Sequence, residues 1–339
     1  MDKNQELQQV NALKTIMMFL VVIYHSLLAC CRNGWGGIND SLQGTTLINY
    51  IAGWLNMFHI EFFTFASGYL FYMLRYEMGR YNTPKEDLKN RFKRLMVPFF
   101  VVSIFWAIPA QLLAYGFSWS IILKGFVLQV SPAQLWFLPM LFLLYIFFYF
   151  CSDYIIEMPI WAVCGGYAVI YLCKIWTSNY IPLGVFQIST AIEYSLYYYL
   201  GFRLRQNEAW IPSIRKVLCL CVIAAATAFG YLVAIEDVSI GTFLEIVRPA
   251  VCAIQVLAVI GLGKVVKVDR LIDKWWFKQF SINSMGIYLF HQQILYAEMR
   301  FFSNMPIVVM SLLYSIIALL GAYAITSAIR RTRIGNIIF

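Results

Sequence analysis

Charge is scarce in this sequence. Only 13% of its 339 residues are charged, whereas soluble domains carry roughly a quarter. Hydrophobic residues make up 61% of the chain, and the mean hydropathy is +0.69. Short segments of alternating polarity, which mark transmembrane β-barrels, are also missing. The composition excludes an ordinary soluble protein. It predicts an all-α integral membrane protein in which residues 1–339 form one membrane-embedded domain, with no separate soluble domain.

The patterns of a metal site and of a nucleic-acid-binding domain are absent too. The eight cysteines include no C-x-x-C pair and lie mostly in apolar segments, so we expect no bound metal. The formal net charge is +9, but no basic soluble domain with interleaved aromatic residues carries it. We therefore interpret the basic excess as a signal of membrane topology and expect no nucleic-acid partner.

Long apolar segments are abundant. A helix needs roughly 20 mostly apolar residues to cross a bilayer core of about 30 Å. Ten segments qualify: 10–31, 46–74, 95–115, 135–152, 156–174, 183–202, 214–235, 242–263, 281–298 and 305–329. With a cytoplasmic N-terminus, the inner segments carry 20 Lys and Arg residues and the outer segments carry 4. Because Lys and Arg accumulate on the cytoplasmic side, we predict about ten transmembrane helices in one bundle, with both termini cytoplasmic.

The end of the first apolar segment, Leu27–Cys30, resembles a lipoprotein cleavage site. A removed signal peptide would have an apolar core without ionisable residues. This segment instead contains Lys14 and His25, and Glu6 precedes it. We expect the segment to be retained as the first transmembrane helix.

Lys14 and His25 are the most informative polar pair. Ionisable residues within a membrane are costly, so each is a functional candidate. The two residues are eleven positions apart, which separates them by about 20° around a helix and by about 16 Å along it. They share one face, with Lys14 near the cytoplasmic surface and His25 past the middle of the membrane. A snorkelling lysine and a hydrogen-bonded packing histidine would produce the same spacing.

Two further pairs lie near the second and third segments. Arg91 and Arg94 are three residues apart and share a helical face, where two guanidinium groups can bind phosphates or simply anchor the inner membrane surface. His59 and Glu61 lie about 160° apart on an ideal helix. They cannot face one pocket unless that helix is distorted.

Five motifs together resemble those of the acyltransferase-3 family of integral membrane acyltransferases. They are Lys14 and His25, Phe58–Phe63 followed by Ser67–Leu70, Arg91–Arg94 followed by Pro98, Leu135–Pro139, and Gly286–His291. Each motif alone is weak, but they occur in the family's order along most of the chain.

The resemblance implies transfer of an acyl group, usually acetyl from acetyl-CoA, to a hydroxyl of a sugar, cell-envelope glycan or lipid-linked saccharide. It implies a multi-pass protein of the cytoplasmic (inner) membrane. His25 matches the family's essential histidine, and Lys14, Arg91 and Arg94 match positions associated with the acyl-CoA donor. Further residues of the motifs are possible members of the pocket: His59, Glu61, Ser67, Trp136 and His291. Glu61 stands where the family often has proline.

The implied chemistry agrees with the residue types. An alcohol needs a base to become a good nucleophile at neutral pH, and histidine is suited to this role. Direct transfer with His25 as general base and transient acylation of His25 are both chemically possible. A transporter or flippase for a lipid-linked or acylated sugar is the alternative function, although no inverted repeat is visible. For the acceptor, Gly34–Gly37 and the tyrosines near Tyr194 are candidate sugar contacts or ordinary membrane-interface residues.

Overall fold

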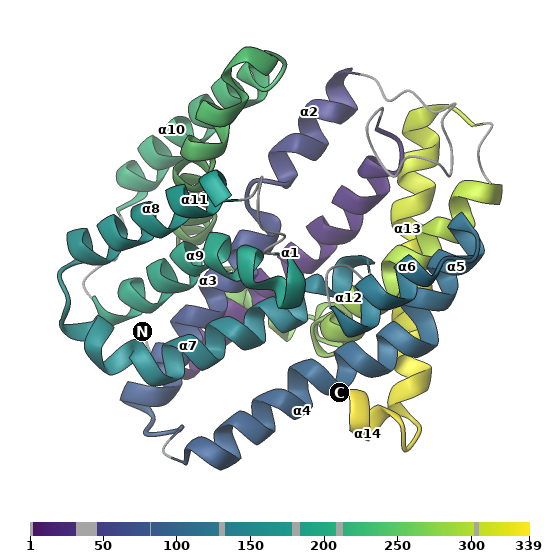
Figure 1. The fold of residues 1–339 in the computed structure, drawn as a ribbon, viewed down its shortest axis with the longest axis horizontal. Helices are drawn as coiled ribbons and strands as arrows, with labels where there is room; N and C mark the ends of the chain where they lie inside the picture. The colour runs from purple at the N-terminus through teal and green to yellow at the C-terminus, as the bar shows by residue number, and fades with distance from the viewer. Residues whose placement is uncertain are drawn as a thin grey trace. The chain divides into compact units, whose positions relative to one another are not determined.

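A computed structural model describes residues 3–31, 46–81, 83–128, 133–177, 184–207, 213–301 and 305–339. Every regular element within these residues is helical, as Figure 1 shows. The predicted all-α class is therefore confirmed for the described chain. The glycine-rich stretch 34–37 lies outside the described residues.

Among the described residues, seven helices are long and apolar enough to cross a membrane. They span Gln5–Leu28, Pro84–Tyr115, Ala133–Glu157, Ile160–Thr177, Ile214–Ala234, Gly241–Val266 and Ile307–Arg330. Each overlaps one of the ten predicted segments. The other three predicted segments contain helices among their described residues but are not among the seven, and the second is broken between Leu55 and His59. The count of ten spans stays a prediction.

The chain folds into two compact units, each assembled from several stretches of sequence. Unit 1 comprises Met1–Phe63, Leu113–Gly116 and Ile211–Gly335, and unit 2 comprises Thr64–Leu112, Phe117–Trp210 and Asn336–Phe339. The chain therefore passes from one unit to the other more than once.

Unit 1 is built around α1, which packs against α11, α12 and α13. Its elements are α1 (Lys3–Leu28), α2 (Thr46–Leu55), the start of α3 (His59–Tyr72), the end of α5 (Ile108–Tyr115), α10 (Ile214–Ala234), η6 (Val238–Ile240), α11 (Gly241–Val266), η7 (Val268–Asp273), α12 (Trp275–Phe301), α13 (Ile307–Arg330) and the first residue of α14 (Gly335–Ile338). Helices α1 and α12 run in the same direction, because Phe19 contacts Phe280 and His25 contacts His291.

Unit 2 is built around α7, which packs against α4 and α9. Its elements are the rest of α3, η1 (Met73–Glu77), α4 (Pro84–Val102), η2 (Ser103–Ala107), the start of α5, α6 (Trp119–Ile122), η3 (Leu123–Val127), η4 (Ala133–Trp136), α7 (Phe137–Glu157), α8 (Ile160–Thr177), η5 (Val185–Gln187) and α9 (Ile188–Gln206). Within it, α3 and α9 approach so closely that a Cβ on Gly68 would lie 1.9 Å from the Tyr198 carbonyl oxygen.

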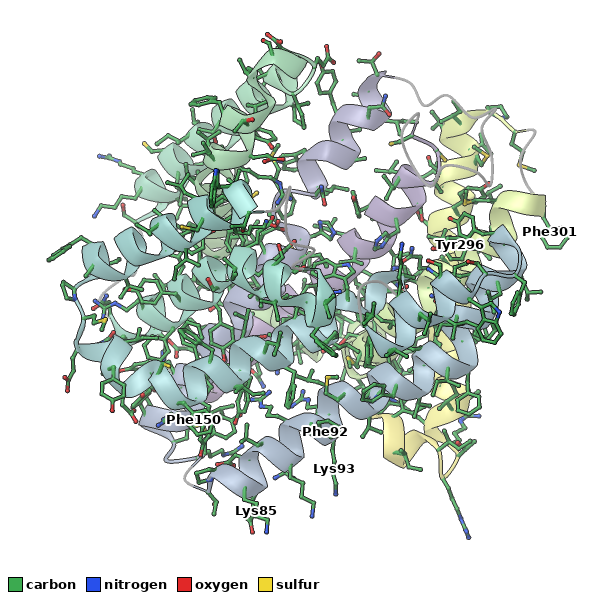
Figure 2. The ribbon with its side chains drawn as sticks, in the orientation of Figure 1. Lys85, Phe92, Lys93, Phe150, Tyr296 and Phe301 are labelled. Carbon is green, nitrogen blue, oxygen red and sulfur yellow. The ribbon has the colours of Figure 1, made fainter. Side chains whose placement is uncertain are left out.

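Helix α4 begins well before its apolar part. Pro84 occupies its first turn, where the missing N–H costs nothing, and Glu86 and Asp87 complement the positive end of the helix dipole. Lys85 and Lys93 project outward from this helix in Figure 2. The helical start places Arg91 and Arg94 on one continuous helix, as their spacing predicts.

Large apolar side chains are widely exposed, which is unusual for a soluble protein. Phe105, Trp161 and Phe301 are each at least 74% exposed. Figure 2 shows Phe301 at the end of α12. Such a surface is expected where helices face lipid rather than water.

Candidate active site

The predicted second span is broken at the point where its polar residues lie. Helix α2 ends at Leu55 and α3 begins at His59. The His59 Nδ1–H donates to the Leu55 carbonyl oxygen across the break, at 2.6 Å. This is the helix distortion without which His59 and Glu61 could not face one pocket, and both side chains are buried.

All three histidines of the chain gather in unit 1. His25 Nδ1 lies 2.9 Å from His291 Nε2. The Tyr24 ring lies 5.1 Å from the His25 ring and 4.5 Å from the His59 ring, measured between centroids. His59 and His291 are buried, whereas His25 is partly exposed. His25 is therefore the histidine of this group that a substrate can reach most directly.

Hydrogen bonds fix which nitrogen of each ring carries the proton. The His291 Nδ1 lies 3.0 Å from the Ile287 carbonyl oxygen, which only accepts, so Nδ1 must be the donor. In neutral His291 the Nε2 is then an acceptor, and His25 Nδ1 donates to it. The basic lone pair of neutral His25 is thereby assigned to Nε2.

Glu61 has an unexpected partner from α11. The Arg248 guanidinium lies 3.5 Å from the Glu61 carboxylate, which is fully buried in the first turn of α3. An arginine opposite a buried carboxylate reduces the cost of burying that charge. This pair links the start of α3 to α11 beside the histidines.

Lys14 and His25 lie on the unbroken helix α1, so they share one of its faces. Lys14 is partly exposed. It lies nearer the helix start, where Gln5 donates to Asp269 of η7 at 3.2 Å.

Arg91 and Arg94 lie in unit 2 and differ in their surroundings. The Arg91 guanidinium donates to the Tyr81 hydroxyl and lies 4.6 Å from the Tyr145 ring centroid and 5.2 Å from that of Tyr81. Contacts of this kind hold a cation over aromatic faces. Arg94 is exposed by comparison. The structure therefore makes Arg94 the more accessible of the two guanidinium groups.

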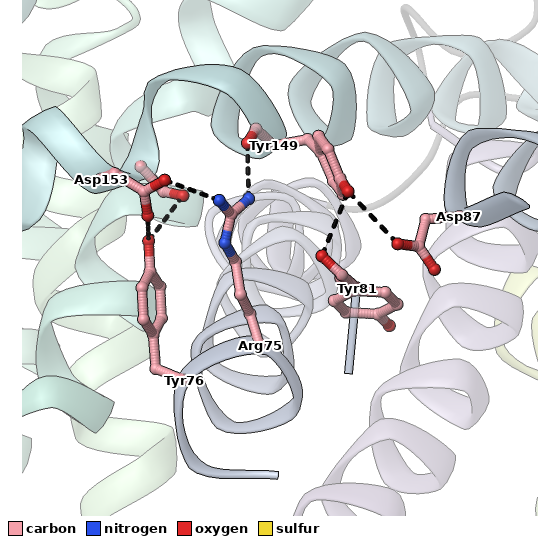
Figure 3. A network of polar contacts seen from close by, with 7 residues as sticks. Arg75, Tyr76, Tyr81, Asp87, Tyr149 and Asp153 are labelled. Carbon is pink, nitrogen blue, oxygen red and sulfur yellow. Dashed lines mark hydrogen bonds and ion pairs between the residues drawn. The ribbon is translucent and has the colours of Figure 1, made fainter. Parts of the chain in front are cut away.

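A network of polar contacts holds the loop that carries Tyr81 (Figure 3). The Tyr149 hydroxyl lies 3.1 Å from the Tyr81 carbonyl oxygen and 3.2 Å from the Asp87 carboxylate. Arg75 reaches the same helix, donating to the Tyr149 carbonyl oxygen at 2.5 Å and to Asp153 at 2.8 Å. These bonds fix the position of the aromatic ring over which Arg91 lies.

The phenol of Tyr76 completes this network on its other side. It donates to Asp153 at 2.5 Å. Burial, followed by this hydrogen bond, raises the pKa of Tyr76 to about 12. The hydroxyl therefore stays protonated at neutral pH and remains a donor.

The remaining predicted pocket residues, Ser67 and Trp136, also belong to unit 2. Ser67 precedes Gly68 at the crossing of α3 with α9 and is partly exposed. The Trp136 ring lies 5.5 Å from that of Tyr194 of α9. Among the described residues, no group of three or more His, Cys, Asp or Glu side chains is arranged to bind a metal.

The comparison with protein families decides the class of this protein. The profile of the acyltransferase domain of the acyltransferase-3 type matches residues 7–331. The chain belongs to the acyltransferase-3 family. No curated protein and no solved structure matches it. Family membership and the seven membrane-length helices together support a multi-pass membrane acyltransferase.

Several contacts of this acyltransferase could not be inferred from the sequence. Arg248 lies three residues from Glu245 on one helix, a spacing that favours an ion pair between those two residues, and its partnership with Glu61 carries no sequence signal. Tyr81 and Tyr145 are two of 22 tyrosines, and nothing in their spacing marks them as neighbours of Arg91. Gly286–His291 did signal a functional segment, but not the contact with His25.

Proposed function

We propose that this protein transfers an acetyl group from acetyl-CoA to a hydroxyl of a sugar, cell-envelope glycan or lipid-linked saccharide, with His25 as general base. The observation that carries the proposal is the chain of hydrogen bonds from His25 through His291 to the Ile287 carbonyl oxygen. It orients the imidazole and assigns its lone pair to Nε2, as a second group orients the base in other acyl-transfer enzymes.

The reaction is a direct transfer. The acceptor hydroxyl gives its proton to His25 Nε2 while its oxygen attacks the thioester carbonyl carbon. The carbon–sulfur bond then breaks and the coenzyme A thiolate leaves, to be protonated by the imidazolium. His291 accepts a hydrogen bond from His25 Nδ1 throughout, which stabilises the positive charge that His25 gains.

The donor phosphates belong with the basic residues. Guanidinium and ammonium groups form strong charge-assisted bonds to phosphate. Arg94 is exposed, and Lys14 lies on the same helical face as His25. We propose that both groups bind the coenzyme A portion, while Tyr81 and Tyr145 hold Arg91 in position. In the inner membrane this would take the donor from the cytoplasm.

The test is the His25→Gln variant assayed in membranes with radiolabelled acetyl-CoA. General-base catalysis contributes about 10²–10⁴-fold, so we expect acetyl transfer to saccharide to fall at least about 100-fold. Ser26→Ala is the matched control, because Ser26 is buried on the same turn and bonds only the Val22 carbonyl within the described contacts. Size-exclusion elution in detergent should be unchanged in both variants.

Three outcomes would contradict this proposal. Full transfer by His25→Gln would remove His25 from the chemistry. Label that stays covalently attached to the wild-type protein without an acceptor, and is lost in His25→Gln, would favour an acyl-histidine route. Uptake of label without any acylation would indicate a transporter.

A further inference from the structure

Helix α12 carries a buried acidic residue, Glu298, which follows His291 along the helix. Among the described residues, it is the second buried carboxyl group after Glu61 of α3. The Glu298 side chain is only 4% exposed. Within the described parts of the chain, neither of its carboxyl oxygens has a hydrogen-bond partner. A carboxyl group buried without a partner is costly and, inside a membrane protein, indicates a functional site.

Tyr314 of α13 lies level with Glu298. A Cβ on Gly286 would lie 2.1 Å from Thr326, and one on Gly321 would lie 3.2 Å from Ile294, so α12 and α13 are antiparallel and in close contact. Twelve residues separate Gly286 from Glu298, and twelve separate Thr326 from Tyr314. This register brings Glu298 and Tyr314 to the same height.

The Tyr314 hydroxyl, like the Glu298 carboxyl group, is buried without a hydrogen-bond partner among the described residues. Tyr314 is fully buried. Tyr314 interacts electrostatically with Glu298 and with Cys30, which follows the end of α1. Two buried polar groups on neighbouring helices therefore share one location, and neither satisfies its hydrogen-bonding capacity within the described protein.

This location is aligned with the proposed base. Glu298 follows His291 by seven residues, which places it about 20° around α12 and about 10 Å further along it. Cys30 is five residues beyond His25, just past the end of the parallel helix α1. The Glu298 carboxyl group, the Tyr314 phenol and the His25–His291 pair therefore lie along one side of the bundle of α1, α12 and α13. The histidines lie further from the end of α1 than Cys30 does.

We propose that Glu298 and Tyr314 bind hydroxyl groups of the acceptor other than the one that is acylated. This inference rests on the proposed function and assigns two residues that would select its polyhydroxylated acceptor over a simple alcohol. A carboxyl group can accept hydrogen bonds from two adjacent hydroxyls, and a phenol can donate one and accept another. A saccharide satisfies both groups at once, whereas an acceptor with a single hydroxyl leaves them unpaired.

Binding can be tested separately from catalysis. Purified protein in nanodiscs is heated with octyl β-glucoside, octyl β-galactoside or octyl N-acetylglucosaminide, and with 1-octanol as the matched alcohol. We expect at least one glycoside to raise the unfolding temperature of the wild type above the value with 1-octanol. Glu298→Gln and Tyr314→Phe should lose that rise. Glu193→Gln is the matched control, because Glu193 is already paired with Lys174 at 2.9 Å, and it should keep the rise.

Measuring acetyl transfer then distinguishes a failure of this acceptor site from a failure of the proposed function. Glu298→Gln should lower kcat/KM for the stabilising glycoside about tenfold, the loss expected when a buried hydrogen-bonding partner is removed, while leaving the KM for acetyl-CoA unchanged. Equal stabilisation of the wild type and Glu298→Gln, or no glycoside effect in the wild type, would overturn the inference. A marked loss of stability in Glu298→Gln without glycoside would also overturn it, by showing a structural partner. If instead the glycosides bind as expected but wild-type membranes show no acyl transfer, the proposed function fails and this binding site stands.

Discussion

His25 and His291 come from opposite ends of the sequence, and each defines the chemistry of the other. His291 is held by a carbonyl of its own helix, so its remaining nitrogen can only accept from His25 when both rings are neutral. The partly exposed ring is thus kept in the tautomer that a base requires. In the proposed mechanism the buried ring orients His25 and accepts its hydrogen bond.

At the same scale, the two arginines of the Arg91–Arg94 motif should have different roles. We predict that Arg94→Ala raises the KM for acetyl-CoA roughly tenfold to a hundredfold, because a bond from a charged donor to phosphate contributes about 1.5–3 kcal/mol. The KM for acceptor and the unfolding temperature should change little. Steady-state kinetics with varied acetyl-CoA checks this.

The neighbouring residue provides the control for this prediction. Lys93 is exposed on the same helix and points outward in Figure 2. Lys93→Ala should leave the KM for acetyl-CoA unchanged. If Lys93→Ala and Arg94→Ala raised the KM for acetyl-CoA equally, Arg94 would contribute only non-specific positive charge and not a direct bond to the donor.

The shared face of Arg91 and Arg94 could be predicted from their spacing, but the aromatic surroundings of Arg91 could not. Tyr81 has a positive φ of 67°, a conformation that sequence normally signals by glycine or asparagine. The contacts that hold this loop are made by Tyr149 of α7, which is distant in the sequence, and by Asp87 of α4, which follows the loop directly. The sequence around Tyr81 does not indicate these tertiary hydrogen bonds.

At the scale of helices, the close crossing of α3 and α9 depends on two glycines. A Cβ on Gly68 would lie 1.9 Å from the Tyr198 carbonyl oxygen, and one on Gly201 would lie 1.9 Å from the Phe65 carbonyl oxygen. Backbone cannot move aside as a flexible side chain can. We predict that Gly68→Ala destabilises the protein by at least about 1–3 kcal/mol, the usual cost of overpacking, as measured by the unfolding temperature in detergent.

Gly166 of α8 is the matched comparison. A Cβ there would meet no described atom within 4 Å. Because alanine favours helix by up to about 1 kcal/mol over glycine, Gly166→Ala should be neutral or stabilising. Equal destabilisation by the two substitutions would mean that helix packing at Gly68 is not the cause.

The elements themselves were largely predictable, because ten apolar segments of sufficient length are visible in the sequence. The break between α2 and α3 was not. Neither proline nor glycine lies between Leu55 and His59, so the sequence indicates a continuous helix. The hydrogen bond from His59 and the ion pair of Glu61 with Arg248 stabilise the broken form. Both depend on the fold.

At the scale of the whole molecule, unit 1 bears on the number of membrane crossings. Helix α1 is parallel to α12, and α12 is antiparallel to α13. Helices α1 and α13 are therefore antiparallel, and Arg330 at the end of α13 bonds the Ile282 carbonyl oxygen near the start of α12. The start of α1 and the end of α13 thus lie at one end of this unit. We therefore predict an even number of crossings between them, because an odd number would place them on opposite sides.

The polar helix α12 would then be one of the additional spans, shielded from lipid by α1 and α13. We predict that reporters fused after Phe339 and before Met1 both report a cytoplasmic location in a bacterial host, since Arg330, Arg331 and Arg333 follow the last span. Alkaline phosphatase fused after Phe339 should be inactive, and green fluorescent protein fused there should fluoresce. Phosphatase inserted after Asp237, in the turn between α10 and α11, should be active and serves as the external control. Active phosphatase after Phe339 would instead favour an odd number of crossings and would contradict the arrangement of α1, α12 and α13.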